Sequence, residues 1–315
     1  LDVLEYARRA DEIGFGRFWL GEHHLTSARL TWSNPLMILP ILLQETERIR
    51  VGMAGVLINH HTPYTVATNF KLLANLFPER CELGCAAGNF PDAVEREMWH
   101  GLVDEVPDCF VSNQERLAAY FNEEQRLLAE ERIAIPPVFG LRPDLFALGS
   151  SYKRYAWAVE HGMNFVKSAF HSSASLDEDE ADRVSRYREA FYARHGRLPR
   201  VVMAVAGACR SDAAGLERAQ RLVRERATHQ KRWRNLIVGP PAEFATRLDE
   251  LSRRFGADEF VVLDIGVHNA EKIAGLAALR EVSELAGGAE LLNATRHPRA
   301  GAPSFIHPPA EVSVS

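Results

Sequence analysis

The sequence predicts a single (β/α)8 TIM barrel, an α/β fold, and three observations lead to this prediction. Short apolar segments alternate with longer segments that carry a helical repeat of apolar residues along most of the 315-residue chain. This alternation is typical of parallel strands joined by helices. The short segments are apolar almost throughout, as expected of strands that are covered on both faces. Before residue 287 no linker rich in Pro, Gly or Ser divides the chain, which favours one closed barrel over two domains.

The first third of the chain opens on a helix. Apolar residues recur every three or four positions up to Gly14, which is suited to end a helix. Pro35 suits the first turn of the next helix, whereas Pro40 should kink it. The apolar, β-branched runs between helices are predicted as strands. In order, we expect a helix over 1–13, a strand over 17–21, a helix over 35–46, a strand over 49–58, a helix over 63–76 and a strand over 81–85.

The middle of the chain is less regular. The segment 90–137 interrupts the alternation, and we interpret it as an insertion that helps to set substrate specificity. A short strand then leads into the turn formed by Gly149, Ser150 and Ser151. In order, we expect a helix over 114–131, a strand over 145–148, a helix over 152–161, a strand over 164–169, a helix over 177–195 and a strand over 201–207.

The last third completes the barrel with three helices and one strand. The helices are predicted over 212–229, 242–255 and 270–286, and the strand over 260–265. These segments give seven strands, whereas a closed barrel of this type needs eight. Because the chain opens on a helix that a strand should precede, we expect the first strand to lie upstream, or one strand to have escaped the count. The barrel domain is thus predicted over 1–286, followed by a flexible tail over 287–315.

The composition is that of an ordinary globular protein. Hydrophobic residues make up 46% of the chain and charged residues 25%, with 37 Lys and Arg against 42 Asp and Glu. A net charge of −5 excludes a protein built around a general nucleic-acid-binding surface. The longest apolar run is interrupted by Pro40, so no membrane span is expected. Four cysteines and no recognisable signal peptide favour the cytoplasm.

Two His-His pairs follow predicted strands, at the end of the barrel where active sites form. His23-His24 and His60-His61 are candidates for acid–base chemistry near neutral pH. Adjacent residues of a strand point to opposite faces, so each pair could send only one imidazole into the mouth. No His-x-His pair of ligands occurs, and we therefore expect no metal site. The structural alternative is that these rings are hydrogen-bonded to loop backbone.

The turn Gly149-Ser150-Ser151 is a candidate phosphate site. A turn of this kind that leads into a helix offers free N–H groups and two hydroxyls to an anion. Tyr152 follows directly, and Arg154 adds a cation in the first helical turn. The structural alternative is ordinary helix capping by serine.

The order of these motifs resembles the bacterial luciferase-like superfamily of flavin-dependent monooxygenases. The resemblance runs in order from residue 1 to about residue 286. The stretches that carry it include Phe18-Trp19-Leu20-Gly21-Glu22-His23-His24, Arg48-Ile49-Arg50-Val51-Gly52, His61-Thr62-Pro63, Phe77-Pro78-Glu79-Arg80 and Leu148-Gly149-Ser150-Ser151.

The resemblance implies a barrel that binds reduced FMN at its mouth, with the flavin supplied by a separate flavin reductase. Such a protein oxidises a small organic metabolite with O₂ through a peroxyflavin. The resemblance assigns acid–base chemistry to His23 and a role in shaping the site to His24. Ala54 and Gly55 match a non-proline cis peptide beneath the flavin ring. It also implies a homodimer formed through helices of the first third of the chain.

The resemblance also places the cofactor phosphate. It assigns the phosphate to the turn at Ser150, Ser151 and Tyr152, and Arg154 falls at a position that often contacts it. Ala87, in the same cofactor-binding stretch as Asn89, stands where relatives commonly carry an arginine. Losing that contact costs about 1.5–3 kcal/mol. Our hypothesis is that Arg154 restores the missing charge.

Three alternatives stay open. A related oxidoreductase would use the deazaflavin F420 for hydride transfer, without oxygen consumption. A non-catalytic partner or flavin-storage homologue is suggested by Ala87 and the incomplete start of the barrel, whereas His23 argues against it. An unrelated hydrolase or aldolase barrel would be active without any flavin.

Overall fold

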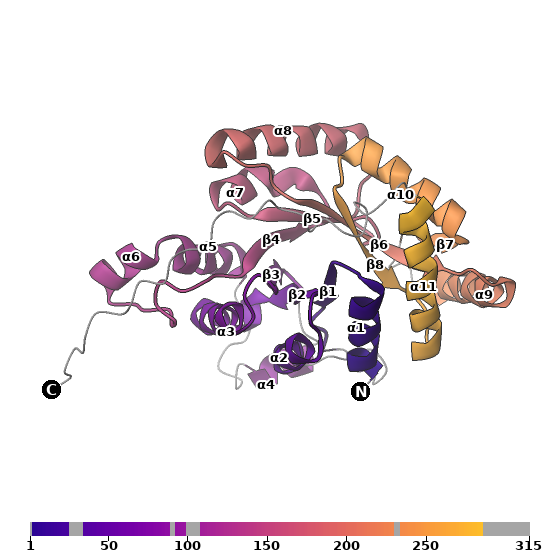
Figure 1. Ribbon diagram of the computed structural model, residues 1–315. Helices are drawn as coiled ribbons and strands as arrows, with labels where there is room; N and C mark the ends of the chain where they lie inside the picture. The colour runs from indigo at the N-terminus through magenta and orange to yellow at the C-terminus, as the bar shows by residue number, and fades with distance from the viewer. Residues whose placement is uncertain (1, 25–33, 89–91, 99–107, 230–233, 286–315) are drawn as a thin grey trace.

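A curved, all-parallel sheet forms the centre of the protein, and helices pack around its outer side (Figure 1). The computed structural model describes residues 2–24, 34–88, 92–98, 108–229 and 234–285. The predicted tail and Asn89 lie outside these ranges. Within them, the α/β class and the repeating strand–helix order predicted from the sequence are confirmed.

Eight strands make up the sheet. From β1 to β6, each strand pairs in parallel with the next one along the chain, and β6 also pairs with both β7 and β8. Seven of the strands are those that the sequence predicted, to within a few residues. The strands are β1 (Arg17–Leu20), β2 (Arg50–Leu57), β3 (Cys81–Ala86), β4 (Asp144–Gly149), β5 (Asn164–Ser168), β6 (Val201–Cys209), β7 (Ile237–Gly239) and β8 (Glu259–Asp264).

The eighth strand, β7, escaped the sequence count because it has only three residues. Gly207 of β6 is in register with Ile237 of β7 and also with Asp264 of β8. Strands β7 and β8 therefore lie on opposite sides of β6, and β7 extends the sheet beyond the end of β5 at Ser168. It does not fill the place before the first helix. In the described part of the chain, no strand lies between β8 and β1.

The helices follow the predicted order with three differences. Helix α2 continues through Pro40. The helix predicted over 114–131 is divided into α5, α6 and a π-helical turn, and α4 was not predicted. The helices are α1 (Asp2–Ile13), α2 (Pro35–Glu45), α3 (Pro63–Leu76), α4 (Asp92–Met98), α5 (Phe110–Asn122), α6 (Glu124–Arg126), α7 (Tyr155–Glu160), α8 (Glu178–His195), α9 (Ala213–His229), α10 (Pro241–Phe255) and α11 (Asn269–Leu285), with short turns η1 (Ile58–His60), η2 (Leu127–Glu131) and η3 (Tyr152–Arg154).

Buried charges connect the two ends of the sheet. Arg17 of β1 forms an ion pair with Glu259 of β8 and lies 3.4 Å from Glu82 of β3. Trp19 Nε1 donates a hydrogen bond of 2.5 Å to Glu82. On the outer side, α1 packs against α11. The two edge strands are thus linked by side chains and helices.

These charges also fix the direction of the barrel. Arg17, Arg50, Asp144 and Glu259 each stand at the first residue of their strand. The ion-pair cluster therefore occupies the amino-terminal end of the sheet. The opposite, carboxyl-terminal end is the mouth, where the predicted site residues lie.

The apolar core has an inner and an outer part. Inside the sheet, Phe146, Val166 and Val202 pack with Trp19 and Leu148. Between the sheet and the helices, a larger cluster buries side chains of both. This division explains why the predicted strands read as continuous apolar runs, since both faces of each strand are covered.

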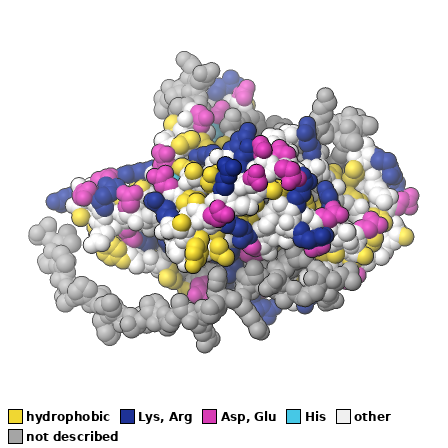
Figure 2. Space-filling view, turned by 90° about the horizontal axis from the view of Figure 1, so that it is seen from above, with side chains coloured by type: hydrophobic (Ala, Val, Ile, Leu, Met, Phe, Trp, Pro, Cys, Tyr) yellow, Lys and Arg dark blue, Asp and Glu magenta, His cyan; other side chains and the backbone are white. Residues whose placement is uncertain are grey.

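The surface carries charges of both signs. On the face shown in Figure 2, Lys and Arg side chains are interspersed with Asp and Glu. One ion pair, between Arg254 of α10 and Glu178 of α8, joins neighbouring helices at 2.7 Å. Among the residues that the structure describes, no helix is both long and apolar enough to span a bilayer.

Candidate active site at the mouth of the barrel

Histidines from three strand ends gather at the mouth of the barrel. His23 and His24 follow β1, His60 and His61 follow β2, and His171 follows β5. Burial lowers the pKa of His171, and the nearby His23 lowers it further. The neutral form of His171 is therefore favoured. The first four of these residues are the acid–base candidates predicted from the sequence.

His23 lies beside the peptide bond between Ala54 and Gly55, which is cis as the resemblance implied. A Cβ atom added to Gly21 would lie 2.8 Å from His23 Cε1 and 3.8 Å from the Ala54 carbonyl oxygen, so both groups contact the same glycine. A Cβ atom on Gly55 would come within 2.7 Å of the Gly84 carbonyl oxygen, a backbone atom that cannot move aside easily. Residue 55 must therefore be glycine in this packing. The position of this peptide beneath a flavin ring stays a prediction.

Glu22 is buried between two of the histidines. Its Oε1 atom lies 3.0 Å from His24 Nε2 and 2.8 Å from His61 Nε2, and its Oε2 atom accepts the Leu57 N–H at 2.9 Å. Burial raises the pKa of Glu22, but the hydrogen bonds from His61, Leu57 and His24 outweigh it and leave the pKa below its ordinary value. Glu22 is therefore ionised at neutral pH.

Glu22 had no predicted role, and its contact with His61 was not predicted, although both residues stand in the motifs that carry the resemblance. Glu22 lies in the loop that follows β1, whereas His61 directly follows η1 after β2. Their contact depends on the pairing of β1 with β2, which brings the two strand ends together. The available signal was the acidic residue directly before the His-His pair.

His60 is buried beside the same cluster. Its Nε2 atom lies 3.5 Å from Glu95 Oε1 of α4. Burial lowers the pKa of His60, although Glu95 and Glu22 act in the opposite direction. Because α4 was not predicted, the contact with Glu95 had no basis in the sequence.

The predicted phosphate turn is already occupied by a side chain. Ser151 Oγ donates a hydrogen bond of 2.6 Å to Glu180 Oε1, and the Tyr152 N–H donates one of 2.8 Å to Glu180 Oε2. Lys167 Nζ lies 3.0 Å from the same Oε2 atom. Ser151 also caps η3 by accepting the Lys153 N–H. The turn thus shows the capping role that the sequence left open, and its role toward a phosphate stays a prediction.

Ser150 and Arg154 keep donors for an anion. Ser150 Oγ accepts a hydrogen bond from Ser173, which leaves its own hydroxyl hydrogen to donate. The Arg154 guanidinium lies over the rings of Phe110 and Trp157, at 5.3 and 4.9 Å from their centroids. It forms no ion pair with a carboxylate in the described ranges. Ala87 lies exposed just beyond β3 and supplies no charge, as predicted from the sequence.

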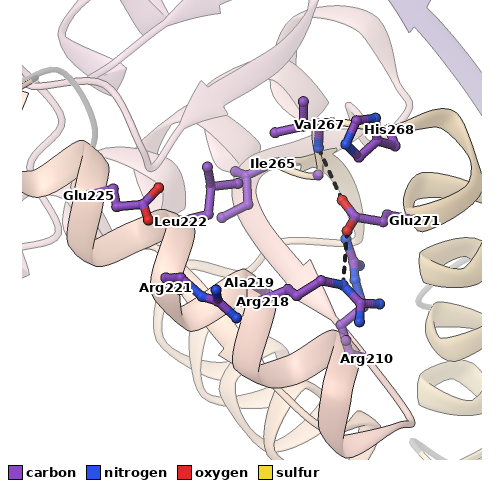
Figure 3. Close-up of a pocket in the computed structure, with 12 residues that line it drawn as sticks. Arg210, Arg218, Ala219, Arg221, Leu222, Glu225, Ile265, Val267, His268 and Glu271 are labelled. Atoms are coloured by element: carbon purple, nitrogen blue, oxygen red, sulfur yellow. Dashed lines mark hydrogen bonds and ion pairs between the residues drawn. The ribbon is translucent and has the colours of Figure 1, made fainter.

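A separate cavity of about 250 Å³ lies between α9, the start of α11 and the loop after β8 (Figure 3). Its Arg218 and Glu271 point toward each other, with Nε and Oε1 3.1 Å apart. Arg210 in its wall is held by both carboxylate oxygens of Asp264 at 2.8 Å. These charges are largely balanced within the wall, and none of the five clustered histidines lines the cavity. The histidine cluster is therefore the stronger candidate site.

Two of the curated relatives from Bacillus subtilis (strain 168) illustrate the similarity. The uncharacterized protein YwcH is 27% identical to this chain, and the match covers 89% of this chain and 92% of YwcH. An N-acetyl-S-alkylcysteine monooxygenase is 30% identical over 53% of this chain and 50% of its own length.

Solved structures show the same fold. Apo-MsnO8 has a TM-score of 0.71 and 22% identity, with 90% of this chain and 92% of that chain covered. The oxygenating constituent of 3,6-diketocamphane monooxygenase from Pseudomonas putida, in complex with FMN, has a TM-score of 0.62, 18% identity and coverage of 94% and 93%. An F420-dependent secondary alcohol dehydrogenase, bound to an F420-acetone adduct, has a TM-score of 0.63, 16% identity and coverage of 89% and 94%.

The sequence profile of luciferase-like monooxygenases matches residues 2–234 of this chain. The matched range includes every strand from β1 to β6 and all five histidines of the mouth. The match extends over well more than half of the sequence, and the chain therefore belongs to the luciferase-like monooxygenase family.

Proposed function

We propose that this protein is a monooxygenase that uses reduced FMN and O₂ to oxidise a small organic molecule. The observation that carries the proposal is the histidine cluster at the carboxyl ends of β1, β2 and β5, in a chain of this family. A separate flavin reductase would supply the reduced FMN. When bound, reduced FMN provides the electrons that activate O₂.

Some of the predicted phosphate-binding residues at the mouth are available to bind a flavin phosphate, and others are not. Ser150 retains a hydroxyl donor, and Arg154 retains a cation flanked by two aromatic rings. Ser151 and the Tyr152 N–H are taken up by Glu180. The phosphate would thus be held by Ser150 and Arg154. A small set of phosphate contacts suits a flavin that arrives and leaves in each turnover.

His23 is the residue proposed to handle protons. It lies against Gly21 at the mouth and next to His171, whose pKa is lowered by burial and by His23 itself. Burial thus favours the neutral form of His171, and we assign the proton transfer to His23. Replacing an acid–base group of this kind lowers turnover by about 10²–10⁴-fold.

The test combines the protein with reduced FMN, ¹⁸O₂ and a panel of small organic sulfides, ketones and alkenes. We expect a product that contains one labelled oxygen atom, and we expect the His23→Asn variant to lose that product while it still binds reduced FMN. Oxidation of the flavin without a labelled product from any substrate would contradict the proposal.

The F420 alternative is supported by the fold likeness to an F420-dependent alcohol dehydrogenase. Under that alternative the protein would reduce F420 anaerobically with an alcohol and would not consume O₂ with reduced FMN. Absence of both activities and of flavin binding would instead indicate the non-catalytic homologue.

A further inference from the structure

We propose that Glu22, His24 and His61 form one coupled proton-holding unit in the mouth of the barrel, with Glu22 as the positioning residue. The unit rests on a shared atom, because both imidazoles direct Nε2 at the same carboxylate oxygen, Oε1 of Glu22. The distance between the two Nε2 atoms therefore cannot exceed the sum of these two hydrogen-bond lengths. Titration of one ring must affect the other.

The shared acceptor fixes the tautomer of both rings. An ionised carboxylate can only accept hydrogen bonds, so each Nε2 atom must carry the hydrogen. Nδ1 is then the atom at which His24 and His61 each gain or lose their second proton. The Leu57 N–H holds the other oxygen of Glu22, which fixes the carboxylate against the end of β2. Glu22 thus determines both the orientation and the reactive nitrogen of the two rings.

Charge makes the second extra proton of the unit harder to bind than the first. The side chain of Glu22 is only 2% exposed, and its ion-pair partners within the described ranges are these two histidines. A buried carboxylate is stabilised by one neighbouring positive charge. Two imidazolium rings against one oxygen atom would repel each other. The first proton is therefore shared between His24 and His61, and the second binds only at lower pH.

In the described part of the chain, the other titratable groups that interact with the unit are histidines and one carboxylate. His60, on η1, interacts with Glu22, His24 and His61, and its own ion-pair partner is Glu95 of α4. His23 and His171, which follow β1 and β5, interact with each other. Burial favours the neutral forms of His60 and His171, so neither ring supplies a fixed positive charge to Glu22.

The use of this proton rests on the proposed function. In a flavin-dependent oxygenation, the unit would hold a proton close to His23 and return it after each transfer. His61 is only partly buried, with 22% of its side chain exposed, so it can exchange the proton with solvent. His24 and Glu22 are more deeply buried.

The test is an NMR titration of the imidazole nitrogens of the whole protein without flavin. In the parent protein, the resonances of His24 and His61 should each respond to the same two titration steps. In Glu22→Gln, the two resonances should lose this shared response and titrate at more acidic pH, because the carboxylate that joins and favours the charged rings is gone. His195, whose Nε2 atom contacts the Val159 carbonyl oxygen far from Glu22 in the sequence, should not change.

Two further variants keep the test decisive. Asp11→Asn also removes a buried carboxylate that accepts backbone N–H groups, but it lies outside the mouth and should leave both midpoints unchanged. If Glu22→Gln does not fold, the His61→Gln variant takes its place, because the glutamine amide can still donate a hydrogen bond to Glu22. In this variant His24 should titrate in a single step. Independent single-step titrations of His24 and His61 in the parent protein would overturn the proposal.

Activity supplies a second readout. If the flavin reaction is confirmed, Glu22→Gln should displace the pH profile of turnover toward acid instead of lowering turnover equally at every pH. Because the NMR titration requires no flavin, a failure of the proposed function leaves its result interpretable. An unchanged pH profile in an active variant would contradict the role of the unit in turnover.

Discussion

Arg154 and Glu180 have different roles at the predicted phosphate turn. Glu180 takes the Ser151 hydroxyl and the Tyr152 N–H, and its charge is balanced by Lys167. Arg154 faces two aromatic rings and forms no ion pair within the described ranges. A cation without a carboxylate partner is suited to a ligand phosphate. We therefore expect Arg154 to provide the main charge contact that Ala87 cannot.

The Arg154→Ala variant should bind FMN about tenfold to a hundredfold more weakly, because a charge-assisted hydrogen bond of about 1.5–3 kcal/mol is lost. Riboflavin, which has no phosphate, should bind the variant and the parent protein equally. Isothermal titration with both flavins measures the difference. Lys153→Ala, which removes the adjacent exposed cation, is the matched control. Equal weakening of FMN and riboflavin binding would contradict the assignment.

Single residues were predictable where a motif fixes them locally. His23, the Ala54–Gly55 peptide and the loss of charge at Ala87 could all be read from short stretches of sequence. The contacts of Glu180 with Ser151 and of His61 with Glu22 could not, because each joins elements that meet only in the folded barrel. The side chain of Glu180 reaches the turn from a helix 29 positions farther along the chain.

At the level of elements, a buried ion pair attaches α8 to the sheet. Lys167 of β5 and Glu180 of α8 are both fully buried, and Lys167 also donates to the Ser150 carbonyl oxygen at 2.7 Å. Burial raises the pKa of Glu180, but the hydrogen bonds from Ser151, Tyr152 and Lys167 outweigh it and lower the pKa below its ordinary value. The pair joins the candidate phosphate turn to two elements of the barrel.

The Lys167→Met variant should lose about 3–5 kcal/mol in the free energy of unfolding, because it leaves the Glu180 charge buried without a partner. Adding Glu180→Gln should restore most of this loss. Urea unfolding of the parent protein and both variants measures the effect. A loss in Lys167→Met that the second substitution does not reduce would contradict this account.

The same pair predicts a pH dependence. Because the pKa of Glu180 is lower in the folded protein than in the unfolded chain, its contribution to stability is present above its ordinary pKa and is lost as the pH falls through the folded value. The parent protein should therefore lose stability in acid more steeply than Lys167→Met/Glu180→Gln. An equally steep loss of stability in acid for the two proteins would contradict this predicted pH dependence.

The two elements that were not predicted from the sequence, β7 and α4, are both short. Strand β7 has three residues and α4 has seven, which is too short for a hydrophobic period to emerge. The place of β7 beside β6 is instead allowed by Gly207, where a Cβ atom would lie 1.9 Å from the Ile237 carbonyl oxygen. The longer helices and the seven buried strands were predictable because several turns or a continuous apolar run repeat the same signal.

At the level of the whole molecule, side chains and helices hold the two ends of the curved sheet together. In the described part of the chain, β1 and β8 are joined by the buried Arg17–Glu259 ion pair and by packing of α1 on α11. Arg17 also lies over the rings of Trp19 and Phe146, at 4.9 and 5.4 Å from their centroids. We infer that Arg17 organises the floor of the barrel.

The Arg17→Met variant should lose about 3–5 kcal/mol of stability, because Glu259 and Glu82 lose a shared positive charge in a buried cluster. The control is Arg247→Met, which removes one partner of an exposed pair with Glu250 and should cost less than about 1 kcal/mol. Urea unfolding compares the two. Equal, small losses would show that Arg17 does not organise the floor of the barrel.

A homodimer through α2 and α3 is the assembly we propose. Both helices expose large apolar side chains, among them Met37 at 67% and Leu76 at 61% exposure. Their burial in a second copy would remove apolar surface from water. Met37→Asp and Leu76→Asp should yield a monomer in size-exclusion chromatography with light scattering. Leu198→Asp, at an equally exposed site after α8, should leave the mass unchanged. A parent protein that is already monomeric would contradict the proposal.

The central claim is that this barrel binds flavin at its histidine-lined mouth. The most direct measurement is an anaerobic titration of the full chain with reduced FMN, followed by flavin fluorescence and by the NMR resonances of His23 and His171. We predict a saturable fluorescence change and a shift of both histidine resonances at the same ligand concentrations. A flat titration, or saturable binding that leaves these histidines unchanged, would contradict the claim.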